Sequence, residues 1–404
     1  MFLRKKISLL VVLSLLFLGC SRSIDKDVFH TNSVEYNPEL SVNHIHFSKE
    51  SSERKKEMLR LSGQGESFDT ITNSNLRSFR TSEFLKVELL DEKNIRVTSW
   101  LAKAVKNVKI YAKVKAVNSS PFLVATLDSI PGFTQLHITP NFVNKESIYK
   151  LENGDWLSFH IPKMRSSSIE FSVDSNDPFY RKVKDEIKVD WYCFFGKYNQ
   201  ANWGRINALY AREWVVMITN WAYMVSSPEM KHLMYNYQKV MDGHITNNEG
   251  RKLTEEEHRS LYDNNILRSR NLRLGITMIG GGLGGGDVYG VDHWVFYSHY
   301  YSLPGTPWEI LSHEFGHVLG YNHSSNMTYG GHDGWASRAM PWLHHYLRKA
   351  QRLPYLDPKL IDFASFRNNI VFYHDLYINP VYTRYPNEET KLDKYFKENP
   401  NWNN

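Results

Sequence analysis

The chain has 404 residues, of which 42% are hydrophobic and 14% aromatic, so it can build buried cores and is long enough for two domains. Its formal net charge of +6 falls to +3 without Arg4, Lys5 and Lys6, and the other basic residues are dispersed, which argues against a nucleic-acid-binding protein. Cys20 and Cys193 are the only cysteines, so no internal disulfide is expected.

The first 20 residues have the pattern of a bacterial lipoprotein signal peptide. A basic start precedes the apolar segment Ile7–Leu18, which is too short to span a membrane as a helix, and Leu16–Cys20 then resembles a lipobox. Acylation of Cys20, for example with palmitate, would anchor the protein in the cell envelope. Ser21 lacks the acidic character associated with inner-membrane retention, so the outer membrane is favoured. An uncleaved anchor and a plain secretory signal are the alternatives.

Residues 21–80 are rich in Ser, Asn, Lys and Glu, and we expect them to form a flexible tether. One short helix is expected near Glu53–Leu61. His44 and His46 lie in this segment, where solvated histidines are expected rather than metal ligands.

Residues 81–180 contain short stretches of strand character. Val108–Lys115 alternates apolar and polar residues, and Asn153-Gly154 is a hairpin signal between Tyr149–Leu151 and Trp156–Ile161. Further strands are expected at Phe84–Leu90, Ile95–Leu101, Phe122–Leu127, Thr134–Ile138 and Ile169–Val173. Their regular spacing predicts a β-sandwich of immunoglobulin-like size, acting as a spacer or docking domain.

Helical patterns begin after residue 181. Val189–Phe195 predicts a buried strand, in which Cys193 is a buried small side chain. Apolar residues then recur at steps of three and four, which predicts a long helix: Ile206, Tyr210, Trp214, Met217, Ile218 and Trp221. Ser226–Glu229 and Thr254–Glu257 have capping patterns that predict two further helices, and the polar stretch Asp242–Lys252 between them reads as an insertion.

An alternating strand is expected at Leu272–Met278, and a glycine-rich stretch follows over residues 280–287. This stretch contains G-x-G-x-x-G, but no Gly-Lys-Ser/Thr follows and Val288–Trp294 does not begin a helix. A phosphate cradle is therefore not expected. A mobile surface loop is one interpretation of the stretch.

One later stretch reads H-E-x-x-H-x-x-G-x-x-H. His313 and His317 are four residues apart, so a helix places both imidazoles on one face. Gly320 can end that helix with a left-handed turn, which lets His323 return to the same place. Three neutral imidazoles suit a zinc ion that keeps one position open. Glu314 lies beside that face and can take a proton from a zinc-bound water without being a ligand itself.

The motif resembles the metzincin clan of zinc metalloproteases, and together with the lipobox it resembles the bacterial zinc-dependent metalloproteinase lipoproteins. His323-Ser324-Ser325 is similar to the matrixin branch. Met327-Thr328-Tyr329 is similar to the Met-turn of astacins and serralysins, which implies that Tyr329 lies near the zinc. Met327 follows His323 more closely than is usual in metzincins, so Met340 is the alternative Met-turn residue.

The resemblance also implies a fold. Metzincins carry a long helix ahead of the zinc helix and a substrate-binding edge strand just before it. The substrate strand is therefore expected at Gly280, Gly281, Gly282, Leu283 and Gly284, where glycine lets a peptide approach closely. We expect an α+β protein in which an N-terminal β-sandwich precedes a metzincin-like zinc metalloprotease domain of a mixed sheet plus long helices.

The loop after the motif contains His332, which is a less well placed alternative to His323 as a ligand. A helix is expected from Ala336 to Arg352, with His344 and His345 on its surface. The expected organisation is a signal peptide at 1–20, a tether at 21–80, a β-sandwich at 81–180, a catalytic domain at 181–355, and a packed extension with a loose tail at 356–404.

The function expected from these features is that of a membrane-anchored zinc endopeptidase. His313, His317 and His323 would bind Zn²⁺, Glu314 would be the general base, and Tyr329 would add a hydrogen bond to the oxyanion. The expected partners are protein or peptide substrates, glycoproteins included, and a membrane reached through the N-terminal lipid; the protein is expected to be a monomer. Two alternatives are a catalytically silent surface lipoprotein that binds glycoproteins and a glycopeptidase that requires O-glycans. The intact Glu314 disfavours the silent protein, because a binding role needs no base.

Overall fold

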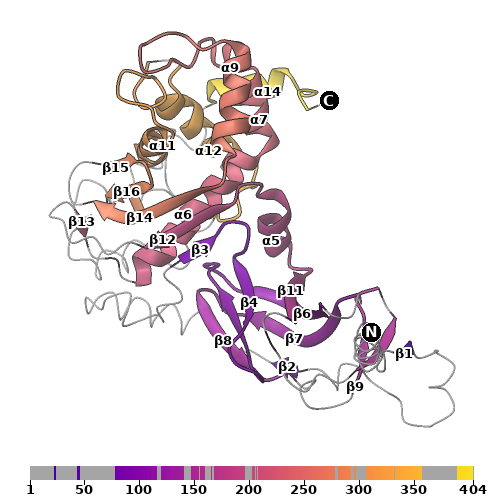
Figure 1. Cartoon of the computed structure of the whole chain (residues 1–404). Coiled ribbons are helices and arrows are strands. Elements are labelled where there is room, and N and C mark those ends of the chain that lie inside the picture. The colour runs from indigo at the N-terminus through magenta and orange to yellow at the C-terminus, as the bar shows by residue number, and fades with distance from the viewer. Residues whose placement is uncertain are drawn as a thin grey trace, which may run out of the picture. The chain divides into compact units, whose positions relative to one another are not determined.

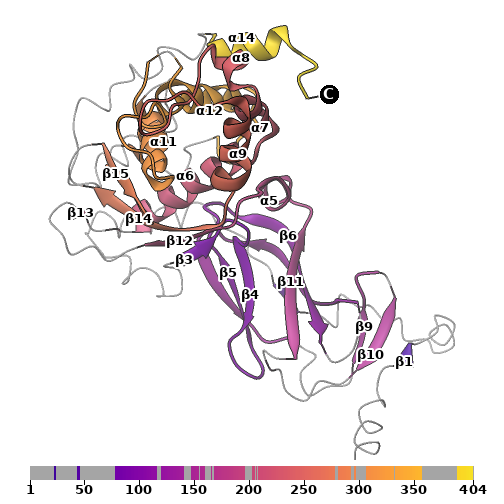
Figure 2. The same ribbon diagram turned by 45° about the horizontal axis from the view of Figure 1, so that its top comes forward.

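Figure 1 and Figure 2 show the computed structural model of the chain from two directions. It describes residues 22–23, 43–45, 78–115, 120–140, 147–153, 155–159, 165, 168–195, 203–204, 206, 208–277, 281–292, 295–296, 306–331, 333–356 and 389–403. Cys20, Gly280 and His332 lie outside these residues. The chain divides into two compact units: one comprises 1–48, 85–99 and 103–177, and the other comprises 49–84, 100–102 and 178–404.

The first unit is built from β-strands. They are β1 (Arg22–Ser23), β2 (Asn43–Ile45), β4 (Leu85–Leu89), β5 (Ile95–Ser99), β6 (Val105–Val114), β7 (Phe122–Ile130), β8 (Thr134–Ile138), β9 (Ser147–Lys150), β10 (Trp156–Phe159) and β11 (Ile169–Ser175). Three sheets result, with the orders β4-β5-β8, β11-β6-β7-β2 and β1-β10-β9. Each strand expected between residues 84 and 173 corresponds to one of these, and β9 and β10 form the expected antiparallel hairpin around Asn153-Gly154.

Alternation along the strands builds the core of the first unit. In β6, Val108 and Ile110 are buried while Lys109 between them is exposed, as a strand with one buried face requires. Buried side chains from the sheets β4-β5-β8 and β11-β6-β7-β2 supply the rest of this core, among them Ile95, Val97, Phe122, Val124, Leu127 and Ile138.

The second unit contains a mixed sheet with the strand order β15-β16-β14-β12-β3. Its strands are β3 (Ser78–Arg80), β12 (Trp191–Phe195), β13 (Trp203–Gly204), β14 (Arg270–Thr277), β15 (Gly282–Gly285) and β16 (Val288–Asp292). β12, β14 and β16 are parallel to one another, whereas β15 and β3 are antiparallel strands at the two ends of the row. Cys193 is fully buried in β12, which confirms its expected role as a small core side chain.

β3 corrects one expectation. A flexible tether is expected at residues 21–80, but 22–23 and 43–45 form the paired strands β1 and β2, and 78–80 pair with β12. Phe79 is buried, with its ring 5.7 Å from that of Phe84. A three-residue strand is too short to show a period, and its partner lies more than a hundred residues later, so the sequence offered no local signal for this pairing.

The long helix expected before the zinc helix is α6 (Ala208–Ser226). The indole Nε1 of Trp214 in α6 donates a hydrogen bond to the carbonyl oxygen of Gly275 in β14, at 3.1 Å. Tyr289 of β16 contacts both Trp214, with ring centroids 5.6 Å apart, and Phe315 of α11 (Thr306–Val318), with centroids 5.9 Å apart. Because one side chain contacts both helices, α6 and α11 lie on the same face of the sheet.

The other helical segments of the second unit are α5 (Pro178–Arg181), η3 (Lys182–Glu186), α7 (Pro228–Tyr235), α8 (Tyr237–Met241), α9 (Glu255–Ser260), η4 (Leu261–Ile266), η5 (Trp335–Ala339), α12 (Met340–Lys349) and α14 (Lys391–Glu398). Both expected caps are present: Ser227 accepts from the backbone N–H of Met230, and Thr254 forms a capping box with Glu257. Among the described residues, no helix is long and apolar enough to cross a membrane.

α12 corrects a second expectation. His344 and His345 are only 3% and 4% exposed, although both were expected on the surface. The ring of His344 stacks on Trp308 of α11 with centroids 4.0 Å apart. Histidine occurs on both apolar and polar faces, so the sequence pattern could not decide which face of this helix would be covered.

α14 is the described part of the C-terminal extension, and it packs on the second unit as expected. The ring of Phe396 lies 4.7 Å from that of Tyr346 in α12, and Trp402 lies 5.2 Å from His232 in α7. Thr390 and Asp393 form a capping box at its start.

Candidate metal centre

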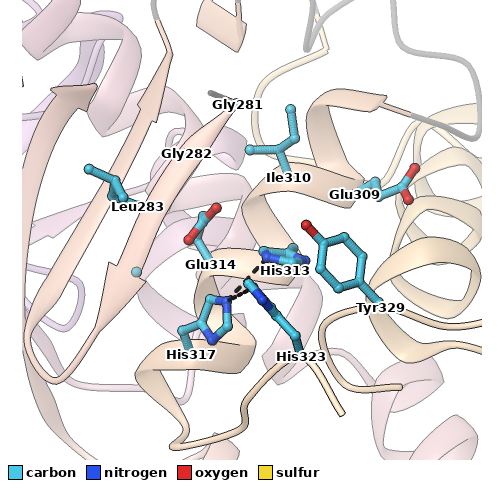
Figure 3. A pocket seen from close by; sticks show the side chains of 11 residues that line it. Gly281, Gly282, Leu283, Glu309, Ile310, His313, Glu314, His317, His323 and Tyr329 are labelled. Carbon is cyan, nitrogen blue, oxygen red and sulfur yellow. Dashed lines mark hydrogen bonds between the residues drawn. The ribbon is translucent and has the colours of Figure 1, made fainter. Parts of the chain in front are cut away.

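Helix α11 carries His313, Glu314 and His317, and its packing fixes their direction. Leu311 and Phe315 are fully buried on the side of the helix that faces the sheet, where Phe315 contacts Trp191 with ring centroids 5.3 Å apart. The two histidines, four residues apart, are half-buried at the edge of this contact and point into a common space. Figure 3 shows this arrangement.

Gly320 ends the helix in the way expected. It has a φ of +92°, which favours glycine. Its N–H donates to the carbonyl of His317 at 3.0 Å, and the N–H of Tyr321 donates to the carbonyl of Gly316 at 3.0 Å. These two bonds form a Schellman motif, which turns the chain so that His323 lies beside the other histidines.

The three imidazoles converge through their Nε2 atoms. Nε2 of His317 lies 3.1 Å from Nε2 of His313 and 3.0 Å from Nε2 of His323. The three candidate ligand atoms all lie within 4.8 Å of one another. Nitrogens bound to one tetrahedral zinc ion lie about 3.3 Å apart, because each Zn–N distance is about 2.0–2.1 Å. The donor set therefore suits zinc, and the two distances from Nε2 of His317 are close to this spacing.

Backbone carbonyls orient two of the rings. Nδ1 of His313 donates to the carbonyl oxygen of Thr328 at 2.9 Å, and Nδ1 of His317 donates to that of Tyr321 at 2.7 Å. When Nδ1 carries the proton, Nε2 is left as a lone-pair donor for a metal. Burial lowers the pKa of both His313 and His317, which favours the neutral form that binds metal.

Glu314 lies next to this cluster and faces the glycine-rich strand β15 (Figure 3). It is 6% exposed, and burial raises its pKa to about 8. A cation held by the neighbouring histidines would favour the charged carboxylate, so a metal would counteract this burial effect. The carboxylate thus lies beside the three histidines but on the next position around the helix, where it is within reach of a molecule bound by them.

The glycines of β15 have a role that the sequence analysis did not identify. A Cβ on Gly282 would lie 2.7 Å from Oε1 of Glu314, and a Cβ on Gly284 would lie 2.2 Å from the carbonyl oxygen of Glu314. Similarly, a Cβ on Gly281 would lie 2.6 Å from Cδ1 of Ile310. These glycines therefore let the strand lie directly against α11. Within the described part of the sheet, β15 is the end strand, and it pairs only with β16.

The strand and the helix enclose a pocket of about 540 Å³ over the histidines. It is lined by Gly281, Gly282, Leu283, Gly284, Glu309, Ile310, His313, Glu314, His317, His323 and Tyr329. The structure thus brings together the three expected ligands, the expected base, the expected tyrosine and the described part of the expected substrate strand. Glu309 was not identified in the sequence, although it precedes His313 by four residues and so lies on the same helix face.

Met327 and Tyr329 lie on the segment that follows His323. Met327 is fully buried, and its carbonyl oxygen would lie 2.8 Å from a Cβ on Gly316. Tyr329 is 57% exposed, with its ring centroid 4.4 Å from that of His313 and 4.8 Å from that of His323. Met340, the alternative Met-turn residue, is instead the first residue of α12. Of the two methionines, Met327 is therefore the one on the segment that packs against Gly316 of α11, between His313 and His317.

No protein-family model, curated protein or solved structure matches this chain. The arrangement of the site therefore rests on the residues and distances given above.

Proposed function

We propose that this chain is a zinc-dependent endopeptidase of the metzincin type, anchored to the bacterial cell envelope through a lipid on Cys20. The observation that carries the proposal is the convergence of three imidazole Nε2 atoms beside a buried carboxylate in one pocket. His313, His317 and His323 would hold the ion, and Glu314 would remain free of it.

A zinc ion held by His313, His317 and His323 would supply Lewis-acid chemistry and would lower the pKa of a water molecule. Glu314 would accept a proton from the attacking water and then deliver it to the leaving amine nitrogen. The hydroxyl of Tyr329 is available to donate a hydrogen bond to the developing oxyanion, because its ring lies against two of the ligands.

The substrate would bind in extended form along β15. An end strand offers backbone N–H and C=O groups to a peptide, and β15 forms one wall of the pocket. Peptides N-methylated at one backbone amide near the scissile bond should then be cleaved less efficiently, with a higher KM, than their unmethylated parents. Equal kinetics for every N-methylated position would argue against strand pairing.

Comparison of Glu314→Gln with His317→Ala tests the activity. Glu314→Gln keeps the size of the side chain but removes the base, so it should retain about one zinc per chain and lose roughly 10²–10⁴-fold in turnover. His317→Ala should lose both zinc and turnover. Glu256→Gln, an exposed glutamate on α9, is the matched control and should behave like the parent.

The substrates for this comparison are a mixed proteome and a set of O-glycosylated proteins, with products read by mass spectrometry. Parent activity in Glu314→Gln would show that the cleavage comes from elsewhere. If all variants bound one glycoprotein and none cleaved it, the protein would be a silent binding protein and not an enzyme. Cleavage confined to glycosylated substrates would identify a glycopeptidase.

A further inference from the structure

The third candidate ligand differs from the other two in how it is held. His313 and His317 are fixed by a helix and by Nδ1 bonds to backbone carbonyls. His323 is exposed, lies on the loop after the helix, and forms no Nδ1 hydrogen bond with the described part of the chain. Its position therefore depends on what holds the backbone on either side of it.

That backbone is held by the polar stretch Asp242–Lys252, which we call the insert. The side-chain amide of Asn248 donates to the carbonyl oxygen of Gly320 at 3.1 Å, while its Oδ1 accepts from the N–H of Asn322 at 2.8 Å. One half-buried side chain thus connects the residue that ends α11 to the residue immediately before His323.

A second set of bonds holds the other side of His323. The N–H of Thr246 donates to Oδ1 of Asn326 at 2.8 Å, and the N–H of Asn326 donates to Oγ1 of Thr246 at 3.0 Å. Nδ2 of Asn326 also donates to the carbonyl of His244 at 2.7 Å, and Oγ of Ser325 donates to the carbonyl of Thr246 at 2.5 Å. The insert therefore binds the loop both before and after the ligand.

The insert is itself held by hydrogen bonds within its turn and by an ion pair to α9. Oδ1 of Asn247 accepts from the N–H groups of Glu249 and Arg251, and Gly250 adopts a φ of +78° in the same turn. Arg251 then binds both carboxylate oxygens of Glu257, at 2.9 and 2.7 Å, and Glu257 also caps α9. The turn is thus tied to the start of a helix.

We propose that the insert is a positioning element for the third metal ligand, with Asn248 of the insert and Asn326 of the loop that carries His323 as the positioning residues. The inference rests on the proposed metal site, but it concerns how firmly this chain retains an ion and not whether it catalyses hydrolysis. Bonds to groups outside the ligand set orient ligands and change metal affinity by about 10–100-fold. Because Asn248 acts through the backbone of the loop, we expect an effect of about tenfold.

The test measures the rate at which zinc leaves the protein for a chromogenic chelator. Asn248→Ala and Asn248→Asp should each release zinc about tenfold faster than the parent chain. The aspartate keeps an acceptor for Asn322 but loses the donor to Gly320. Asn264→Ala is the matched control, because its side chain is exposed on η4 and, within the described part of the chain, bonds only Ser260. Melting of the zinc-free proteins should be the same for all four chains, since Asn248 is expected to position the ligand loop rather than hold the fold.

Three results would overturn the inference. Equal release rates for Asn248→Ala and Asn264→Ala would show that the insert does not restrain the ligand. A large loss of melting temperature in both zinc-free Asn248 variants, absent from Asn264→Ala, would make Asn248 a general stabilising residue. If the parent chain bound no zinc at all, both the proposed function and this inference would be wrong. If the parent bound zinc and the Asn248 variants released it at the parent rate, only the inference would be wrong.

Discussion

Gly316 of α11 lies so close to Met327 that a Cβ on the glycine would be 2.8 Å from the methionine carbonyl oxygen and 2.9 Å from Cγ2 of Thr328. This close approach brings the carbonyl of Thr328 within 2.9 Å of Nδ1 of His313. Gly316 stands between the two histidines of the helix, so the contact joins the ligand helix to the segment that carries Met327 and Tyr329.

Gly316→Ala tests this contact. Alanine is the better helix former by about 1 kcal/mol, so helix propensity alone predicts a more stable protein. We expect the opposite, a loss of about 1–3 kcal/mol in the free energy of unfolding, because the added methyl displaces the Met327–Thr328 backbone. Zinc affinity should fall with it, since Thr328 orients His313. Gly331→Ala has open space around its Cβ and is the control in denaturation and zinc titration. A stabilised Gly316→Ala would contradict the packing described.

Gly282 and Gly284 should respond differently to alanine. A Cβ on Gly282 meets the flexible side chain of Glu314, so Gly282→Ala should keep zinc and fold but lower kcat by moving the base. A Cβ on Gly284 meets the backbone of Glu314, so Gly284→Ala should lower the free energy of unfolding by about 1–3 kcal/mol. Melting curves and single-turnover kinetics of both variants separate these effects. If both variants matched the parent, the strand could not lie this close to the helix.

Tyr329→Phe keeps the ring that lies against His313 and His323 but removes the hydroxyl. If the hydroxyl binds the oxyanion, kcat should fall by roughly 10²-fold while KM and zinc content change little. Tyr329→Ala, which also removes the ring, serves as the comparison and should alter zinc release as well. Loss of zinc in Tyr329→Phe would instead assign the hydroxyl to metal retention.

His258 should make the zinc-free protein less stable in acid. It is fully buried, and burial lowers its pKa from 6.5 to about 4. His244, Glu255 and Glu257 are the titratable groups acting on it, and its Nε2 accepts from the N–H of Ile245. Between about pH 6.5 and 4 the unfolded chain binds more protons at this residue, so its contribution to stability falls as the pH falls and levels off below about 4.

The contribution of His258 is obtained by comparing the parent with His258→Gln. Unliganded His313 and His317 also make stability fall with falling pH, but they do so equally in both chains, so their effect cancels in the difference. Glutamine keeps an acceptor near Ile245 but does not titrate. Denaturation of the chelated proteins at several pH values should give a shallower acid slope for the variant. Parallel curves would mean that His258 does not titrate differently in the two states.

Anchoring depends on the expected acylation of Cys20. Cys20→Ser should release the protein from membranes, because the lipid is expected to be attached to its thiol. Membrane fractionation after a salt wash compares it with Ser21→Ala, which keeps the cysteine. Retention of Cys20→Ser with the membranes would favour an uncleaved anchor.

Local sequence was enough to identify features that depend on neighbouring residues. The strands β4 to β11 of the first unit, the caps at Ser227 and Thr254, and the left-handed end of α11 at Gly320 all follow from patterns a few residues long. The convergence of His313, His317 and His323 was predictable for the same reason, because a helix and one glycine turn bring them together.

Tertiary structure decided the features whose partners are distant along the chain. The pairing of β3 with β12, the burial of His344 under Trp308, and the packing of Gly284 on the backbone of Glu314 join residues 30 to more than 100 positions apart. The hydrogen bonds from Asn248 to the backbone of the loop that carries His323 also join residues that are distant along the chain. A short sequence pattern indicates which residues can form a helix, a strand or a turn, but it does not indicate which other part of the chain will pack against them. That surface is set by close packing, and close packing is defined only once the whole chain has folded.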